Sequence, residues 1–243
     1  MRPEESLRSL GFSERDARVL ADHFEDADRR GKEGHGTSRI EWLARLDGVD
    51  PIAVPERVVA EDGFERWEAR GALGYLVLNA VVESQLASPP RNARLVVAAG
   101  AFPTGVLGYW VRRLAVGGLA AALTATSPRR LGHPDGGPPL AGTNPLAIGV
   151  PSSDGRPLVA DVSMGAVTYG DVLSGRASAD ELVPFGGDQA HKAFALAVGL
   201  QTFVEALAGE AGGAVLVVAR PGADPVPALR ALAGGVRLPG DRS

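Results

Sequence analysis

Apolar residues recur at helical spacing along several parts of the chain. Ser13 followed by Asp16 is a helix-start pattern, and apolar residues then fill positions i, i+3, i+4 and i+7, which predicts a helix to about Arg30. Further helices are predicted over residues 72–87, 106–114 and 225–233. The longest helical pattern covers residues 189–208, and its expected buried stripe consists of Leu196, Leu200, Phe203, Val204 and Leu207.

Short apolar runs between turn signals predict the strands. They lie at residues 58–61, 95–99, 119–126, 145–150, 157–162 and 214–219. The runs 145–150 and 157–162 are joined by Ser152-Ser153-Asp154-Gly155, a hairpin-type turn, so we expect them to pair antiparallel. The predicted fold class is therefore α/β with a mixed, partly antiparallel sheet flanked by helices.

Length and composition set the scale of the fold. A chain of 243 residues can bury a substantial core without disulfides, and this chain contains no cysteine. The lack of cysteine excludes a disulfide framework, a thiolate zinc site and a cysteine nucleophile. We expect one unit over residues 1–243, in which a helical part of about residues 1–50 packs on an α/β core of about residues 51–243.

Charge and hydropathy narrow the range of partners. The net charge of −4 argues against a nucleic-acid surface, which needs clustered cations. The longest apolar runs fall short of the roughly 20 residues that span a bilayer, and the first ten residues lack the apolar segment of a secretory signal. We therefore expect a cytoplasmic protein that binds neither nucleic acid nor membrane. Lysine is rare, with only Lys32 and Lys192 among 25 basic residues.

The first candidate site is the loop Gly34-His35-Gly36 with Arg39 after it. Ser38-Arg39-Ile40-Glu41 matches a capping box, which places Arg39 in the first turn of a helix that turns Ile40, Leu43 and Leu46 inward. A helix start favours an anion, and a guanidinium there could bind a carboxylate through two hydrogen bonds. His35 has an ordinary pKa near 6.5, which suits proton transfer. The pattern indicates a carboxylate substrate beside a proton donor, and the alternative is a loop histidine with a solvated arginine.

Two further candidates carry open alternatives. Asp161 ends an apolar strand, where a carboxylate can orient a histidine or cap residues 163–166 as a helix. The turn Gly186-Gly187-Asp188 leads into the predicted helix 189–208, with Lys192 in its first turn. This turn could hold a phosphate or carboxylate, or only cap the helix.

Several common sites are missing from the sequence. No G-x-G-x-x-G follows a strand, and neither a G-x-x-x-x-G-K-[ST] loop nor a G-x-S-x-G elbow is present. The four histidines show no metal-ligand spacing, so we expect no metal site.

A set of short motifs runs in order over most of the chain. Gly142-Thr143-Asn144-Pro145 matches a G-T-N-P motif, and residues 157–161 (PLVAD) follow it at the usual distance. Four further segments resemble family motifs. Residues 34–39 resemble S-H-G-x-x-R, and residues 184–187 resemble P-L-G-G. Residues 191–192 resemble the H-K of G-H-K-G, and residues 238–241 resemble I-P-G-E. In this order the motifs resemble those of the type-2 malate/L-lactate dehydrogenase family. That family includes ureidoglycolate and sulfolactate dehydrogenases and piperideine-2-carboxylate/pyrroline-2-carboxylate reductases.

The resemblance implies a non-Rossmann fold that binds NADPH or NADH, in most members as a homodimer. It implies hydride transfer between a 2-hydroxy and a 2-oxo acid, or reduction of a cyclic 2-imino acid. Residue by residue, it implies catalytic roles for His35, Asp161 and Lys192, and substrate contacts for Arg39, Thr143 and His191. The implied cofactor contacts are Gly142, Asn144, Pro145, Val162, Ser163, Met164, Gly186 and Gly187.

The chain also departs from the family pattern. Pro103 stands where some members carry a proton-accepting histidine, Gly34 replaces a serine, and Ala190 replaces a glycine. The chain is shorter than members of the family between Tyr169 and Pro184 and before Leu238.

These departures leave three hypotheses. The first is an oxidoreductase with His35 as its only histidine acid, and an imine substrate would suit it because a protonated iminium is already activated. The second is a repurposed isomerase, lyase or cyclase that acts on a similar acid through His35 and Asp161. The third is a non-catalytic partner that keeps the fold.

Overall fold

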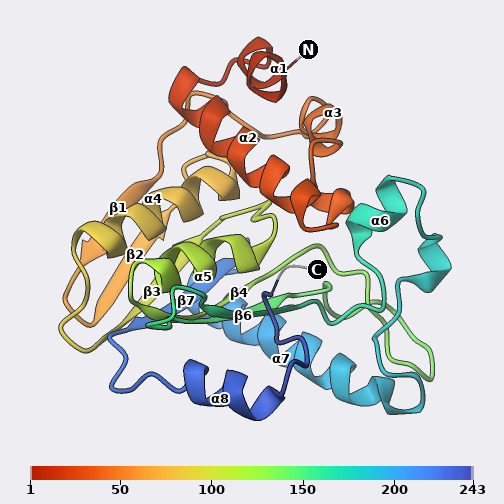
Figure 1. Ribbon diagram of the computed structural model, residues 1–243. Helices are drawn as coiled ribbons and strands as arrows, with labels where there is room; N and C mark the ends of the chain where they lie inside the picture. The colour runs from red at the N-terminus through yellow and green to blue at the C-terminus, as the bar shows by residue number, and fades with distance from the viewer. Residues whose placement is uncertain (1, 242–243) are drawn as a thin grey trace.

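Seven strands form one mixed sheet at the centre of the computed structural model, which describes residues 2–241 (Figure 1). Their order across the sheet is β1-β2-β3-β7-β4-β5-β6. Only β2 and β3 pair in parallel, and the other pairs are antiparallel. The strands are β1 (Glu56–Ala60), β2 (Phe64–Glu68), β3 (Ala93–Ala99), β4 (Ala120–Ala125), β5 (Leu146–Val150), β6 (Leu158–Val162) and β7 (Gly213–Ala219). The predicted mixed α/β fold is confirmed.

Helices cover both faces of this sheet (Figure 1). One face carries α4 (Gly74–Ala87) and α5 (Leu107–Val116), and the other carries α7 (Ala190–Ala208) and α8 (Val226–Ala233). Beyond α4 lie α1 (Pro3–Ser9), α2 (Glu14–Arg29), the 3₁₀ turn η1 (Glu33–His35) and α3 (Arg39–Leu43). The remaining segments are α6 (Tyr169–Leu173), η2 (Ala179–Glu181) and η3 (Gly187–Gln189). The N-terminal helices thus meet the α/β layers along α2, α4 and α5.

Elements with strong local signals match their predictions. The Ser13 hydroxyl accepts a hydrogen bond from the Asp16 N–H at 3.1 Å and caps α2 as expected. The β5–β6 hairpin pairs Leu146 with Val162 and Val150 with Leu158, which confirms the antiparallel prediction.

The predicted buried stripe of α7 is wrong in part. Leu196 is 52% exposed and Phe203 is 49% exposed. The helix instead turns small and polar residues toward the rest of the protein, namely Ala190, Ala193, Ala197, Gln201, Val204 and Ala208. Small side chains let a helix approach a sheet closely, so its larger apolar residues are left facing outward.

Two local predictions near the candidate site are also wrong. Ser38 does not cap α3, because its hydroxyl donates to the Glu33 carbonyl at 3.1 Å. Residues 163–166 do not form a helix, so Asp161 caps none. Strand β2 was not predicted, because one of its buried positions is the charged residue Glu65. The Glu65 carboxylate accepts hydrogen bonds from the indole N–H of Trp67 and the side-chain amide of Gln85.

Among residues 2–241, no helix combines the length and the hydropathy needed to cross a bilayer. The same residues contain no cluster of His, Asp and Glu suited to holding a metal ion.

Candidate active site

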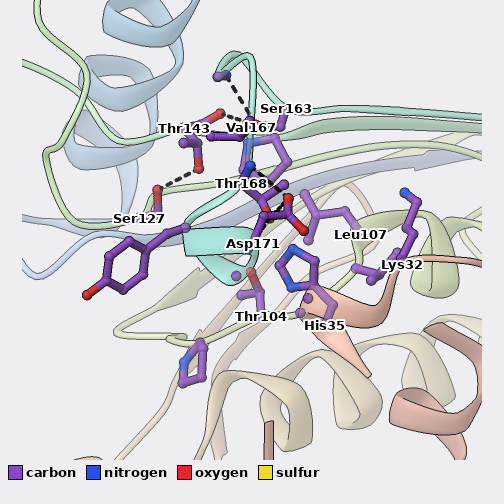
Figure 2. A pocket seen from close by; sticks show the side chains of 18 of the residues that line it. Lys32, His35, Thr104, Leu107, Ser127, Thr143, Ser163, Val167, Thr168 and Asp171 are labelled. Atoms are coloured by element: carbon purple, nitrogen blue, oxygen red, sulfur yellow. Dashed lines mark hydrogen bonds between the residues drawn. The ribbon is translucent and has the colours of Figure 1, made fainter. Parts of the chain in front are cut away.

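Three of the segments that line a cavity of about 800 Å³ are distant from one another in sequence. The first segment is the loop from Gly31 to Arg39, the second runs from Phe102 into the start of α5, and the third runs from the end of β6 to Asp171. Figure 2 shows side chains from all three segments around the same space, with His35 between Lys32 and Thr104 and close to Asp171.

The loop that carries His35 is fixed by short polar contacts. The Asp28 carboxylate accepts hydrogen bonds from the Thr37 N–H at 3.0 Å and the Thr37 hydroxyl at 2.8 Å. A Cβ at Gly36 would overlap that carboxylate, so only glycine fits at this position. The Asp28 carboxylate therefore holds the loop that carries His35 in one conformation.

Gly34 stands where the family pattern has a serine, and the fold explains the change. A Cβ at Gly34 would lie 3.0 Å from the Gly170 carbonyl carbon and 2.9 Å from an Asp171 carboxylate oxygen. A Cβ at Gly170 would in turn overlap the Gly34 carbonyl. Helix α6 thus packs directly against the His35 loop, and this contact excludes any side chain at residue 34.

His35 lies in a weakly solvated environment and is influenced by two cationic and two anionic side chains. Burial is the main cause that lowers the pKa of its imidazole, and the charges of Arg39 and Lys32 lower it further, to about 4. Asp161 and Asp171 act in the opposite direction. His35 is therefore neutral at physiological pH, and a neutral imidazole can accept a proton.

Arg39 is 8% exposed and lines the same cavity. Its Nε donates to the Gly34 carbonyl at 2.7 Å, and its guanidinium lies 4.7 Å from the centre of the Trp42 ring. The Nη1 nitrogen is buried and has no hydrogen-bond partner among residues 2–241. Because Arg39 lines the cavity, its guanidinium can bind a ligand anion there.

Asp161 is bound by Lys32, which belongs to the first of the three segments. The Lys32 Nζ donates to the Asp161 carboxylate at 2.6 Å. That carboxylate also packs on the first turn of α5, where a Cβ at Gly108 would lie 2.9 Å from it. The ion pair joins the His35 loop to the end of β6 at the edge of the cavity.

The G-T-N-P segment presents Thr143 to the cavity by means of buried hydrogen bonds. The Asn144 amide donates to the Ala197 carbonyl at 2.9 Å and to the Gln201 side chain at 2.8 Å. Asn144 also accepts from the Ser127 N–H at 3.0 Å. The Thr143 and Ser127 hydroxyls face each other at 3.3 Å, as drawn in Figure 2.

The structure separates the predicted site residues into two groups. Those that line the cavity are His35, Arg39, Thr143, Pro145, Asp161, Val162 and Ser163. Those that do not line it are Gly142, Asn144, Met164, Gly186, Gly187, His191 and Lys192. In this second group, Asn144 and Met164 are buried in packing, whereas His191 and Lys192 are exposed on the first turn of α7. The substrate and cofactor roles assigned to all of these residues stay predictions.

Sequence reasoning missed several residues that line the cavity. Among them are Lys32, Tyr75, Thr104, Ser127, Tyr169 and Asp171. The rarity of lysine was a signal for Lys32. Tyr75 lies within an apolar helical pattern that is typical of core, and no local pattern marked Asp171.

A second cavity, of about 880 Å³, is rich in arginine. The two cavities are lined from the same three parts of the chain, namely the residues just after α2, helix α5 and strand β6. Gly31, Leu107 and Asp161 line the first cavity. Arg30, Arg112 and Val159 line the second. The arginines that line the second cavity are Arg30, Arg112, Arg156, Arg230 and Arg237.

Carboxylates offset only part of this positive charge. Asp26 binds Arg30 and Arg112, Asp154 binds Arg156 and Arg230, and Asp241 binds Arg230. Five arginines thus share three carboxylates, and Arg237 has no ion pair among residues 2–241. The cavity is suited to an anion.

Comparisons with known proteins agree with this architecture. The family model for malate/L-lactate dehydrogenase matches residues 3–181. A (2R)-3-sulfolactate dehydrogenase (NADP(+)) from Chromohalobacter salexigens is 32% identical over 184 residues, which cover 74% of this chain and 55% of that protein. A Δ1-pyrroline-2-carboxylate/Δ1-piperideine-2-carboxylate reductase from Pseudomonas putida is 29% identical over 229 residues, 82% of this chain and 66% of that protein.

A solved structure gives the same result. The crystal structure of Δ1-piperideine-2-carboxylate reductase from Pseudomonas syringae pv. tomato matches with a TM-score of 0.83 at 26% identity, over 99% of this chain and 88% of that chain. The chain therefore has the fold of these enzymes, although it spans only about half the length of the sulfolactate dehydrogenase.

Proposed function

Because the chain belongs to the malate/L-lactate dehydrogenase family, we propose that it is an NAD(P)H-dependent oxidoreductase. Its substrate would be a small 2-oxo or 2-hydroxy acid, or a cyclic 2-imino acid. The observation that carries this proposal is that His35 and the guanidinium of Arg39 line one cavity. We place the protein in the cytoplasm, where the reduced nicotinamide pool is kept.

Arg39 and His35 have separate roles, Arg39 in substrate binding and His35 in proton transfer. The Arg39 guanidinium, which lines the cavity, binds the substrate carboxylate and so fixes the position of C2. The bound nicotinamide supplies or accepts the hydride at C2. During oxidation, neutral His35 accepts the proton of the C2 hydroxyl, and during reduction the protonated ring returns it. An anionic substrate offsets the charge of Arg39 that lowers the His35 pKa, so His35 binds a proton more readily in the complex than in the free protein.

The linings of the two cavities suit the two ends of a dinucleotide. The first offers the apolar side chains of Leu107 and Val162 beside the Ser163 hydroxyl, which suits a nicotinamide ring and its ribose. The surplus of arginine in the second suits phosphate groups, including the 2′-phosphate that distinguishes NADPH from NADH. We therefore propose that NADPH is preferred.

Cofactor binding tests this proposal directly. A ligand that binds only the folded state at 100 times its Kd stabilises it by about 2.7 kcal/mol, which for a chain of this size raises the Tm by roughly 5–10 °C. We expect NADPH to give this shift at a lower concentration than NADH in a thermal melt. The Arg237→Ala variant should reduce the preference for NADPH about tenfold, the effect of losing one charge-assisted hydrogen bond.

Arg91→Ala is the matched control, because Arg91 is exposed and lies outside both cavities. It should keep the preference of the unmodified protein. If neither nucleotide raises the Tm, the redox assignment is wrong and the result favours the non-redox hypothesis. If Arg237→Ala weakens NADH and NADPH equally, the 2′-phosphate assignment alone is wrong.

We further propose that the protein is a homodimer in which a second copy covers α7. Leu196 and Phe203 are about half exposed on this helix, and no charged residue occurs between Ala193 and Val204. A surface helix normally has charged or polar residues on its outer side. The exposed apolar side of α7 therefore supports a protein–protein contact.

A charge placed on this helix should separate the two copies. Sedimentation velocity is expected to give a dimer for the unmodified chain and a monomer for Phe203→Glu, since a stable interface cannot bury an unpaired carboxylate. Ile52→Glu, at an apolar residue that is 79% exposed before β1, is the control and should stay dimeric. A monomeric unmodified chain, or a Phe203→Glu variant that remains a dimer, would contradict the assignment.

A further inference from the structure

Tyr75 is an unassigned polar group that lines the cavity of His35 and Arg39. It lies in the first turn of α4, which is held on the loop of residues 101–105. The Gly74 N–H donates to the Phe102 carbonyl at 3.2 Å, and a Cβ at Gly105 would overlap the Tyr75 ring. The ring also packs edge-on against His23, with 4.9 Å between ring centres. These contacts fix the direction of the side chain.

The Tyr75 hydroxyl has no hydrogen-bond partner among residues 2–241, although the residue is only 1% exposed. Its oxygen is not among the buried side-chain atoms that lack both a partner and accessible surface. The hydroxyl therefore opens onto the cavity that the ring lines. A phenol in this position gains a hydrogen bond when a ligand oxygen enters the cavity.

The Arg39 guanidinium lines the same cavity as Tyr75. The Arg39 charge acts on the phenol and lowers its pKa, but burial has the larger effect and raises the pKa of Tyr75 to about 12. The hydroxyl thus stays protonated and can donate at any working pH. The C2 oxygen of a 2-oxo acid is on the carbon next to the carboxylate, so a carboxylate held by Arg39 leaves that oxygen in the cavity that Tyr75 also lines.

We propose that the Tyr75 hydroxyl donates a hydrogen bond to the C2 oxygen of a bound 2-oxo acid and makes the site selective for oxo over imino acids in its rate of reduction. This inference rests on the proposed oxidoreductase function. As hydride reaches C2, the π pair of the C=O bond moves onto oxygen, and the phenolic O–H stabilises the developing charge. The proton that completes the 2-hydroxy acid comes from His35, and the Tyr75 O–H bond is kept.

Cyclic imino acids provide the contrast that tests this role. A protonated imine has no lone pair on nitrogen, so it cannot accept a hydrogen bond from Tyr75. Tyr75→Phe removes only the hydroxyl and keeps the ring packed on His23. We expect it to lower kcat for pyruvate reduction with NADPH about 10²–10³-fold, the usual effect of losing one such donor. Its rate with Δ1-piperideine-2-carboxylate should be unchanged.

Tyr109→Phe is the matched control, because Tyr109 packs on the same His23 at 4.8 Å but does not line the cavity. It should leave both rates unchanged. Equal losses for both substrates in Tyr75→Phe, or no loss for pyruvate, would overturn the proposal.

A binding measurement separates this inference from the proposed function. Calorimetry with oxamate, whose amide carbonyl stands at C2, should give a Kd about tenfold weaker for Tyr75→Phe than for the unmodified chain, the effect of one hydrogen bond. If the unmodified chain reduces neither acid yet shows this loss of oxamate affinity, the redox function fails and the contact of Tyr75 stands. If oxamate binds both proteins equally, or binds neither, the Tyr75 inference is wrong.

Discussion

Replacing His35 with glutamine is expected to lower kcat about 10²–10⁴-fold, the range for loss of a positioned acid–base group. Glutamine has a similar size and keeps the loop packed, but it cannot transfer a proton. The measurement is steady-state oxidation of a 2-hydroxy acid with NADP⁺, together with a thermal melt to show that the fold is kept. His133→Gln is the control, because His133 is exposed and lies away from the cavity.

The pH dependence of the same reaction distinguishes His35 from an ordinary histidine. Oxidation needs the neutral imidazole as a base, and this form is lost as the pH falls through the pKa of the free protein. Burial and the charges of Arg39 and Lys32 hold that pKa at about 4, so kcat/KM should begin to fall only near pH 4 instead of near 6.5. A fall in kcat/KM that begins near pH 6.5 would mean that His35 is solvated and distant from Arg39. Full activity in His35→Gln would remove it from the reaction.

Local signals account for the parts of this protein that the sequence predicted well. The Ser13 cap of α2 and the turn at residues 152–155 act within a few residues, so their outcome does not depend on the rest of the chain. The prediction of a buried stripe on α7 was wrong in part, because burial on this helix depends on what the helix packs against. Gln201 faces inward because it accepts the Gly142 N–H and binds Asn144, two contacts that span more than fifty residues.

The same reasoning applies to the candidate site. His35 and Arg39 are four residues apart, so their presence in one cavity could be predicted from a loop and a helix start. Lys32 and Asp161 are separated by 129 positions and form an ion pair only because β6 ends beside the His35 loop. Asp171 approaches His35 because glycine at both 34 and 170 lets α6 pack against the loop, a requirement that only the folded chain reveals.

Replacing Arg39 with glutamine should have its main effect on substrate binding. A buried, charge-assisted pair that loses one partner costs about 2–5 kcal/mol, which corresponds to roughly a 30- to 3,000-fold rise in KM for the acid. Arg39→Lys keeps the charge but loses the planar fork of donors, so its KM should lie between those of Arg39→Gln and the unmodified chain. Both variants are measured with saturating NADPH, so that cofactor binding does not limit the rate.

The Arg39→Gln variant also tests the effect of the Arg39 charge on the pKa of His35. Removing the Arg39 charge removes one of the causes that lower the His35 pKa, so the acid limb of kcat/KM should move above pH 4. Arg45→Gln, at an exposed arginine just after α3, should change neither KM nor the pH limb. A raised KM without a shift of the limb would place Arg39 on the substrate but too far from His35 to act on it. An unchanged KM would mean that another group holds the carboxylate and that the pairing of His35 with Arg39 does not define the site.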